Sequence, residues 1–352
     1  MEPDYEKIIK DAVVYDSIFS AFRHFAPSSV ILELENDVCH PFRSSETYEL
    51  MQMPDGKLAA LPRIFMSMGY RGENGVFEHC EASIFRNLKT VDGYDSTGIA
   101  IDEVRIIEFE NILKTFPQIK AAEREGLIVD YMALAQHYEL NTPMLDITAE
   151  PAIAAYFATQ RFHDGVAEPI CDGIGCIRGI STIRESYNIM QGQPSRLHTF
   201  GMQAFHRPGL QMAFGLETKC GEDLSDQGWR LYFRQTRRAS EAIYHNFHLN
   251  LETHRIEKKS WLFPDEDIVD VAAFVKRSTS LSEAAVRTYC DRNNINPNDF
   301  AAAVKDRGIK IVSRPIYELS PSRILELTKE TKDAPYGDVK IMTRLMMLPP
   351  AK

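Results

Sequence analysis

The chain has 352 residues, of which 44% are hydrophobic, and its 50 acidic and 40 basic residues give a net charge of -10. This length suffices for one large core or two smaller ones, and the negative charge makes nucleic acid and anionic membrane surfaces unfavourable partners. No run of about 18 apolar residues occurs, and the acidic N-terminus does not resemble a signal peptide, so we expect a cytoplasmic protein.

The cysteines are scattered and form no Cys-x-x-Cys pair, which favours free thiols over disulfides or zinc ligands. Cys171, Cys176 and His163 match no standard zinc spacing and lack a clear fourth ligand, so no metal is expected. The six cysteines are Cys39, Cys80, Cys171, Cys176, Cys220 and Cys290.

The first 58 residues predict a mostly helical extension. Apolar residues recur at helical spacing over residues 5–25 and predict an amphipathic helix that Pro27 ends. Residues 30–34 predict a short strand, and the Pro, Ser and Gly content of residues 41–56 predicts a loop before a domain boundary near residue 58.

The segment around Arg71 predicts a strand followed by a turn. Residues 64–70 have the pattern of a strand, and the polar and glycine residues after them predict a turn, so Arg71 is expected at the end of the strand. Residues 103–125 then predict a helix that is interrupted at Pro117.

The next segments predict a helix, a strand and a second helix. Residues 130–138 predict the first helix, and Asp130 can cap its free amides. Residues 144–147 alternate briefly like a strand, and Thr148 is placed to cap the following helix over residues 152–162.

The rest of the chain predicts more strands and helices. Strands are expected at residues 173–180, 209–216, 229–234 and 243–249, followed by a helix at 268–275. An appended unit is expected to contain helices at 281–290 and 299–305 and a strand at 309–316. Because helices and strands mix without regular β-α-β alternation, we predict an α+β fold with a mixed or antiparallel sheet core and flanking helices. The expected domains are residues 1–58, 59–278 and 279–352.

Four segments carry a resemblance to a known family: Tyr70-Arg71-Gly72, then residues 82–86, 134–158 and 207–214. The third contains the sequences LAQHYELNTPMLDIT and AAYFA. These are similar to the stretches QHYGLPTRLLDWT and ALYFA of the FRG family, a largely uncharacterised group of bacterial and phage-related proteins named for a Phe/Tyr, Arg, Gly motif. Residues from about 60 to 275 therefore resemble this family, and the sequence LFPDED near their end is similar to its closing segment.

Four residues depart from the family pattern. Where Gly, Arg, Trp and Gly are usual, this chain has Glu139, Met144, Ile147 and Ala213. If the usual Arg contacts a phosphate, Met144 removes that charge, which implies that this branch binds another ligand or none.

Arg71 has two interpretations. A guanidinium beside Gly72 can bind phosphate or carboxylate, while the glycine lets a ligand approach the backbone. Alternatively, Arg71 pairs with a neighbouring acid such as Glu73 or Glu81. The other family segments favour the functional interpretation.

Three further polar residues lie near a Pro turn. His137 and Tyr138 could contact a ligand or move a proton, or they could be structural, as a His that bonds the last carbonyls of a helix is. Asp146 lies in an otherwise apolar strand, where a carboxylate is costly to bury alone, so it is either a site carboxylate or the partner of an arginine such as Arg71 or Arg86, and we favour the pairing.

The order of the segments is also similar, more distantly, to that of arginine-type ADP-ribosyltransferases. This resemblance implies a transferase-like fold with NAD bound through Arg71, Thr148 on a second strand, and Gln211 on a third strand where those enzymes have Glu or a neighbouring Gln. The chemistry requires a carboxylate near the sugar, because a ribosyl cation develops there. Gln211 is uncharged and Glu217 lies about 20 Å further along an extended strand, so Asp146 is the better candidate.

Two functions remain open. The leading hypothesis is an enzyme that binds NAD or a related nucleotide and transfers or hydrolyses its ribosyl group, with a role in bacterial conflict or phage defence. The alternative is a noncatalytic nucleotide- or protein-binding module whose flanking units contact a protein partner. The expected catalytic residues are Arg71, His137, Asp146 and Gln211. The expected ligand-binding residues are Tyr70, Gly72, Arg86, Tyr138, Thr148 and Arg207.

Overall fold

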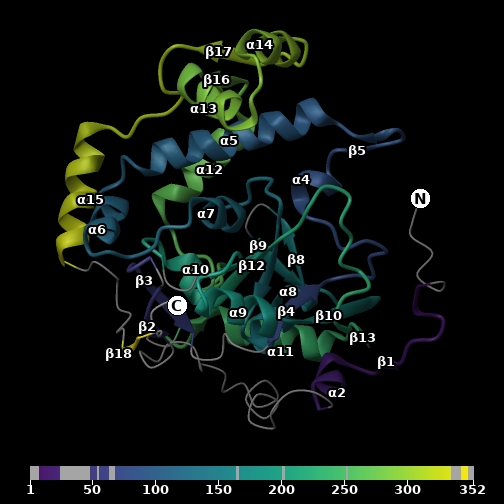
Figure 1. Ribbon diagram of the computed structural model, residues 1–352. Coiled ribbons are helices and arrows are strands. Elements are labelled where there is room, and N and C mark those ends of the chain that lie inside the picture. The colour runs from purple at the N-terminus through teal and green to yellow at the C-terminus, as the bar shows by residue number, and fades with distance from the viewer. Residues whose placement is uncertain are drawn as a thin grey trace.

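The structure is a computed structural model that describes residues 8–23, 48–53, 55–62, 68–163, 166–199, 203–250, 253–333 and 342–347 (Figure 1). The predicted strand at residues 30–34 lies outside this part of the chain, as do the first four residues of the strand predicted at 64–70. Within the described residues, no helix is both long and apolar enough to cross a membrane.

A seven-stranded mixed sheet forms the centre of the molecule, which confirms the predicted α+β class. Its neighbours pair antiparallel except for the two strands at one edge, which run parallel. In spatial order the strands are β1 (Val14–Tyr15), β13 (Trp229–Arg234), β10 (Ile174–Ser181), β4 (Met68–Glu73), β7 (Met144–Thr148), β12 (Ala213–Glu217) and β11 (Leu197–Thr199).

The sheet is split between β4 and β7. Only one residue pair, Tyr70 with Thr148, joins these two described strands, whereas β4 pairs along its whole length with β10 and β7 pairs along its whole length with β12. Beyond that pair, the Arg71 side chain bridges the gap, because its Nη1 donates to the backbone carbonyl of Asp146 at 3.0 Å. The sheet therefore consists of two halves that part on the side of Arg71 and Asp146.

Helix α8 (Pro151–Thr159) covers β4 at very short range. A Cβ atom added at Gly72 would lie 1.9 Å from the backbone oxygen of Ala154, so only glycine permits this approach. Helix α11 (Arg237–His248) packs against α8 in turn. These contacts build the main core, in which Tyr156, Phe233 and Phe247 are almost fully buried.

A second layer of helices lies beside the sheet and has its own apolar core. Phe109, Phe116, Leu134, Ile268 and Val275 are fully buried within it. The helices are α5 (Ser96–Leu113), α6 (Pro117–Arg124), α7 (Tyr131–His137), α12 (Asp267–Arg277) and α15 (Pro321–Asp333). The predicted break of a long helix at Pro117 is confirmed, since Pro117 begins α6.

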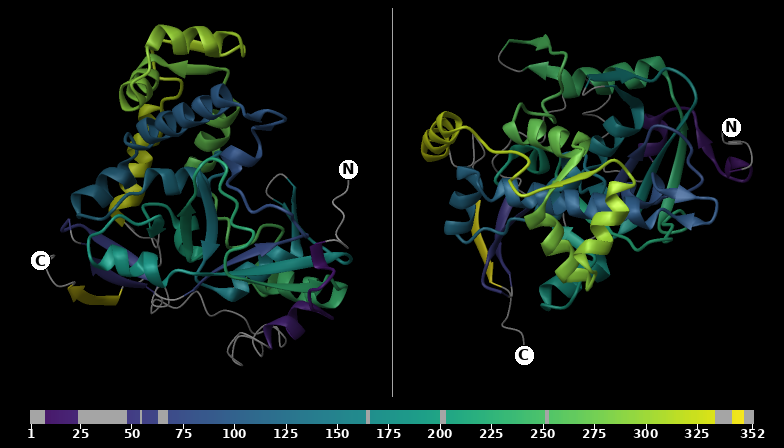
Figure 2. Two further views of the ribbon diagram at one scale, coloured as in Figure 1. Left: turned by 45° about the vertical axis from the view of Figure 1, so that its right-hand side comes forward. Right: turned by 90° about the horizontal axis from the view of Figure 1, so that it is seen from above.

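The appended unit packs on the far side of α5 from the sheet (Figure 2). Ile101, Val104 and Ile107 of α5 complete its apolar core. The unit contains β16 (Ser280–Ser282), α13 (Glu283–Asn293), α14 (Pro297–Lys305) and β17 (Lys310–Val312). The remaining elements are short: α2 (Ile18–Phe22), β2 (Tyr48–Gln52), β3 (Leu58–Pro62), α4 (Ser83–Arg86), β5 (Lys89–Thr90), β6 (Gly93–Tyr94), β8 (Gln160–His163), β9 (Val166–Pro169), α9 (Ile183–Met190), α10 (His206–Leu210), β14 (Leu249–Asn250), β15 (Arg255–Ile256) and β18 (Met342–Met347).

The helix predicted over residues 5–25 is wrong. Val14 and Tyr15 instead form β1, which pairs with β13, and Ser17 starts α2 by accepting a hydrogen bond from the Ser20 amide. The β-branched and aromatic side chains fit a sheet edge, and this pairing overrides the helical spacing of the sequence.

Two other predicted elements are also wrong, each for its own reason. Residues 243–248 belong to α11 and only Leu249 starts a strand, β14, because Ala239, Ile243 and Phe247 place one apolar face of a helix against the core. The loop predicted over residues 41–56 contains β2, which pairs with β3 and with the C-terminal β18. The pairing with β18 joins segments about 300 residues apart in the chain, which no local pattern can reveal.

Candidate functional site

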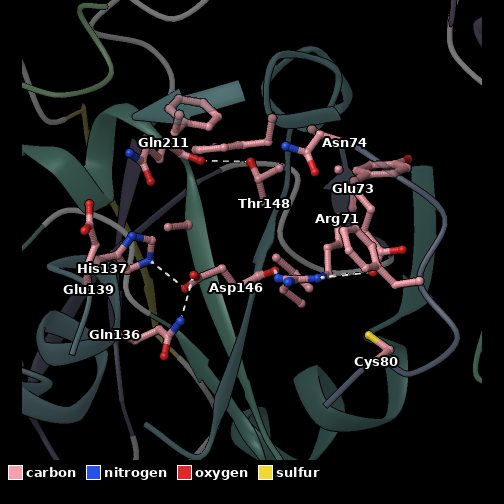
Figure 3. A pocket seen from close by; sticks show the side chains of 18 of the residues that line it. Arg71, Glu73, Asn74, Cys80, Gln136, His137, Glu139, Asp146, Thr148 and Gln211 are labelled. Atoms are coloured by element: carbon pink, nitrogen blue, oxygen red, sulfur yellow. Dashed lines mark hydrogen bonds and ion pairs between the residues drawn. The ribbon is translucent and has the colours of Figure 1, made fainter. Parts of the chain in front are cut away.

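A cavity of about 550 Å³ lies where the two halves of the sheet part (Figure 3). Nine of the ten predicted site residues line it: Tyr70, Arg71, Gly72, Arg86, His137, Asp146, Thr148, Arg207 and Gln211. Tyr138 does not line it, since its side chain is buried and its hydroxyl donates to Glu266 Oε2 at 2.5 Å. That burial raises the pKa of Tyr138 well above its usual value, so the phenol is a structural hydrogen-bond donor.

Arg71 lies inside β4, not at its end, because the strand continues to Glu73. Its guanidinium is held on two sides: Nη1 donates to the Asp146 carbonyl, and Nε lies 3.6 Å from Glu73 Oε1. The side chain is 21% exposed. Arg71 thus combines the two interpretations of the sequence, since it pairs loosely with Glu73 and also lines the cavity.

Arg86, in the last turn of α4, is a second cation at the cavity. No described residue accepts a hydrogen bond from its guanidinium or pairs with it within 4.0 Å. Partial burial and the positive charge of Arg71 lower the pKa of Arg86. Two guanidinium groups that repel each other in one cavity favour an anion between them.

Asp146 does not pair with Arg71 or Arg86 through its carboxylate, so that prediction is wrong. Its Oδ2 accepts from Gln136 Nε2 at 2.8 Å, and its Oδ1 lies 3.8 Å from His137 Nε2. The reason is the alternation of the strand: Arg71 reaches the backbone of Asp146, while the carboxylate turns toward helix α7 (Figure 3). The Asp146 side chain is 42% exposed, although its Oδ1 is buried.

Gln136 lines the cavity, although the sequence analysis did not identify it as a site residue. Thr142 Oγ1 donates to Gln136 Oε1 and itself accepts from the Met144 amide at 3.2 Å. Because the Asp146 carboxylate can only accept, the Gln136 amide turns its NH2 group toward Asp146 and its oxygen toward the Thr142 hydroxyl. This pair of contacts fixes the orientation of the carboxylate.

His137 is buried beside Asp146. Burial lowers the pKa of His137, and the charge of Asp146 only partly opposes this effect. The imidazole is therefore neutral near neutral pH, a state in which one ring nitrogen can accept a proton.

Gln211 and Thr148 hold the floor of the cavity together. Gln211 caps the C-terminus of α10 and does not lie on a strand, because Met212 has a φ of 44° and β12 begins only at Ala213. The Gln211 side chain donates to the Leu262 backbone carbonyl at 3.1 Å, and the backbone carbonyl of Gln211 accepts from Thr148 Oγ1 at 2.8 Å. Glu150, not Thr148, caps α8 through the Ala152 amide.

Three phenylalanines form an aromatic wall of the cavity: Phe157, Phe162 and Phe263. Their ring centroids lie 5.6 to 6.1 Å apart. Arg207 is buried behind them, with its guanidinium 4.6 Å from the Tyr138 ring and 5.1 Å from the Phe263 ring, and its Nη1 donates to the His137 carbonyl. Arg207 is therefore fixed by cation-π contacts and supports the wall.

Glu139 also lines the cavity and has a φ of 70°, which is unfavourable for a residue with a side chain. Its amide donates to the Gln136 carbonyl and the Leu140 amide donates to Ala135, so it occupies the left-handed position that ends α7. Glycine suits this position best, so Glu139 places a carboxylate at the cavity at the cost of an unfavourable backbone conformation.

Met144, where the family pattern has Arg, is fully buried against Ala133 and Ala213 and does not line the cavity. In the described part of the chain, no group of three or more His, Cys, Asp or Glu side chains is arranged to hold a metal ion.

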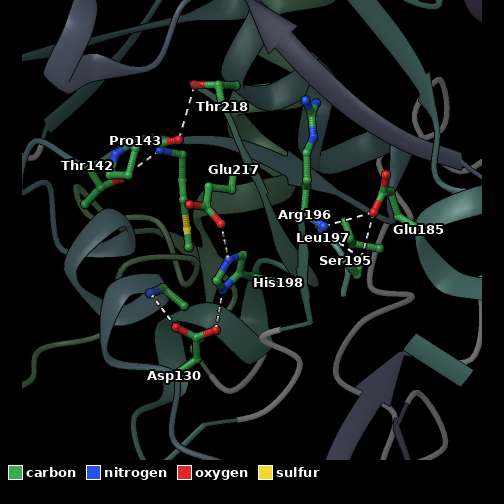
Figure 4. Close-up of polar contacts among 12 residues, drawn as sticks. Asp130, Thr142, Pro143, Glu185, Ser195, Arg196, Leu197, His198, Glu217 and Thr218 are labelled. Carbon is green, nitrogen blue, oxygen red and sulfur yellow. Dashed lines mark hydrogen bonds and ion pairs between the residues drawn. The ribbon is translucent and has the colours of Figure 1, made fainter. Parts of the chain in front are cut away.

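A histidine outside the cavity bridges two carboxylates and supports α7 (Figure 4). His198 Nδ1 lies 2.7 Å from Asp130 Oδ2, and its Nε2 lies 3.3 Å from Glu217 Oε2. Asp130 is also the N-cap of α7, as predicted, because its Oδ1 accepts from the Ala133 amide. Burial lowers the pKa of His198, but the bonds to the two carboxylates outweigh it and raise the pKa above its usual value.

We expect His198→Gln to destabilise the protein more at about pH 6 than at about pH 9. Because the pKa of His198 is higher in the folded state, its contribution is fully present below about pH 6.5 and is lost as pH rises through the folded-state pKa. The loss at low pH should be on the order of 1 kcal/mol. Denaturant unfolding of both proteins at both pH values measures it, and an equal difference at the two pH values would contradict the bridge.

The fold and the cavity together define an α+β protein whose split sheet carries a polar cavity with two arginines on one side and an aromatic wall. Residues 66–165 match the family model of the FRG domain, so the chain contains an FRG domain, as its motifs predict. No curated protein and no solved structure matches the chain significantly. The matched segment includes β4 and β7, but Arg207, Gln211 and Phe263 lie beyond it, so the cavity needs residues from outside the match.

Proposed function

We propose that the cavity binds a nucleotide, with NAD as the leading candidate, and that the domain transfers or hydrolyses the ribosyl group. The observation that carries this proposal is the pair Arg71 and Arg86 at one cavity. Guanidinium groups bind phosphate through two parallel hydrogen bonds, and the aromatic wall offers a face on which a base or a pyridine ring can stack.

Asp146 supplies the carboxylate that the reaction requires. Figure 3 places it between Arg71 on one side and Gln136 and His137 on the other. In hydrolysis, the bond between the ribose C1′ and the nicotinamide nitrogen breaks and takes its electron pair to nicotinamide. Water forms the new bond at C1′, and its proton passes to a base such as neutral His137 or to solvent. The negative charge of Asp146 stabilises the cationic sugar between these events.

The second candidate is a noncatalytic module, and one observation favours it. Glu73 lies between Arg71 and the buried Arg178, so part of the charge at the cavity belongs to a structural ion network. Binding without turnover would support this candidate over the enzyme. The role in bacterial conflict and the protein partner at the flanking units stay predictions.

The test of nucleotide binding is titration calorimetry of NAD, ATP and ADP-ribose with wild type and Arg71→Ala. We expect the variant to bind about 10- to 100-fold more weakly, because a charge-assisted contact contributes about 1.5 to 3 kcal/mol. Arg230→Ala is the matched control. This substitution also removes one positive charge, but Arg230 lies on β13 and does not line the cavity.

Wild type that binds none of these nucleotides would overturn the proposal. Equal binding by wild type and Arg71→Ala would remove Arg71 as the anion anchor. Melting curves of the three proteins show whether a loss of binding is a loss of folding.

A further inference from the structure

A line of polar contacts runs beneath the cavity from β10 to β7. The backbone carbonyl of Ser225 accepts from Arg178 Nη1 at 3.0 Å, and Arg178 Nε donates to Glu73 Oε2 at 2.8 Å. The other oxygen of Glu73 lies 3.6 Å from Arg71 Nε, and Arg71 continues the line to the Asp146 carbonyl. Arg178 itself does not line the cavity.

Because the charged groups along this line are buried, each charge must be compensated by a neighbouring group of opposite charge. The Arg178 side chain is 1% exposed and that of Glu73 is 5% exposed, so neither charge is solvated by water. A buried carboxylate must take its compensation from the nearest cation. Between its two neighbours, Glu73 makes a hydrogen bond with Arg178 and only a longer ion pair with Arg71.

We propose that Arg178 is a positioning residue for the anion site: by neutralising Glu73, it leaves the charge of Arg71 available to a ligand in the cavity. This inference rests on the proposed function, because it assigns Arg71 to an anionic ligand. Without Arg178, Glu73 has Arg71 as its nearest cation and draws that guanidinium into a closer pair. The ligand then loses a partner although Arg71 is still present.

A different role for Glu73 predicts a different effect of its substitution on ligand binding. If Glu73 serves to orient Arg71 for the ligand, removing the Glu73 charge weakens binding. If Arg178 serves to neutralise Glu73, removing both charges together leaves Arg71 as it is in the wild type. The variants Arg178→Met, Glu73→Gln and the double variant separate these cases, and each retains most of the side-chain volume.

The experiment measures the affinity of each variant for inorganic pyrophosphate and for NAD by titration calorimetry. We expect Arg178→Met to bind about tenfold or more weakly, Glu73→Gln to bind at least as tightly as wild type, and the double variant to return to within about threefold of wild type. Arg230→Met, on the neighbouring strand, controls for the loss of a positive charge as such.

Recovery of binding in the double variant is the result that a merely structural role of Arg178 would not produce. Weaker binding by Glu73→Gln, or no change in Arg178→Met, overturns the inference. If Arg178→Met does not fold, Glu73→Gln and the double variant still decide, because binding about tenfold weaker in either overturns it. If pyrophosphate binds and NAD does not, NAD is not the nucleotide of the proposed function, and the pyrophosphate affinities alone test the role of Arg178. If wild type binds neither probe, Arg71 holds no anion and the assignment to Arg178 falls with it.

Discussion

Gly72→Ala is expected to destabilise the protein by about 3 kcal/mol or more, because the added methyl group has no space. Its Cβ would lie 1.9 Å from the Ala154 oxygen and 2.8 Å from the Ala158 nitrogen, and both are backbone atoms of α8 that cannot rotate away. Helix α8 would have to move off β4, and the buried contacts of Tyr156 would be lost with it. Chemical denaturation of the purified variant measures the loss.

Gly75→Ala is the matched control for this substitution. Gly75 follows the same strand, and a Cβ there would meet only the Phe77 ring, at 3.5 Å, which is ordinary contact. Its stability should stay within about 1 kcal/mol of wild type. A Gly72→Ala protein as stable as Gly75→Ala would show that α8 does not pack on β4 at this distance. A stable Gly72→Ala protein that fails to bind its ligand would instead support the sequence-based view that the ligand approaches Gly72.

The sequence predicted the cavity better than it predicted the contacts within it. Motifs in four separate segments identified nine residues that line one cavity, even where the element type was wrong, as at Gln211, which caps helix α10 and does not lie on a strand. The partners were harder to predict. Asp146 was assigned to an arginine, yet its carboxylate accepts a hydrogen bond from Gln136, which only the packing of α7 against β7 brings near it.

Two features of the site have no local signal in the sequence. The importance of Arg178 depends on register: β10 pairs antiparallel with β4 so that Arg178 lies opposite Arg71, a contact more than 100 residues apart in the chain. The role of Gly72 depends on how α8 folds back over β4. The Tyr70-Arg71-Gly72 motif identifies Gly72 as a residue of interest, but only the packing shows that this glycine makes room for helix α8.

Asp146→Asn is expected to reduce release of nicotinamide from NAD by about 100- to 1000-fold, with little change in NAD binding. Removing one preorganised electrostatic partner of a developing charge typically costs this much in rate. Asparagine has nearly the same shape, and its side-chain oxygen can still accept from Gln136 Nε2, so the cavity keeps its form. Binding should survive because the anion contacts belong to Arg71 and Arg86.

The matched control is Asp172→Asn, which makes the same chemical change at an exposed carboxylate that does not line the cavity. Chromatography of the reaction products, together with calorimetric titration, separates turnover from binding in all three proteins. We expect Asp172→Asn to turn over like wild type. If Asp146→Asn also turns over like wild type, Asp146 is not the carboxylate that stabilises the sugar. If wild type binds NAD and releases no nicotinamide, the domain is a binding module, and Asp146 beside His137 serves ligand recognition and not bond cleavage.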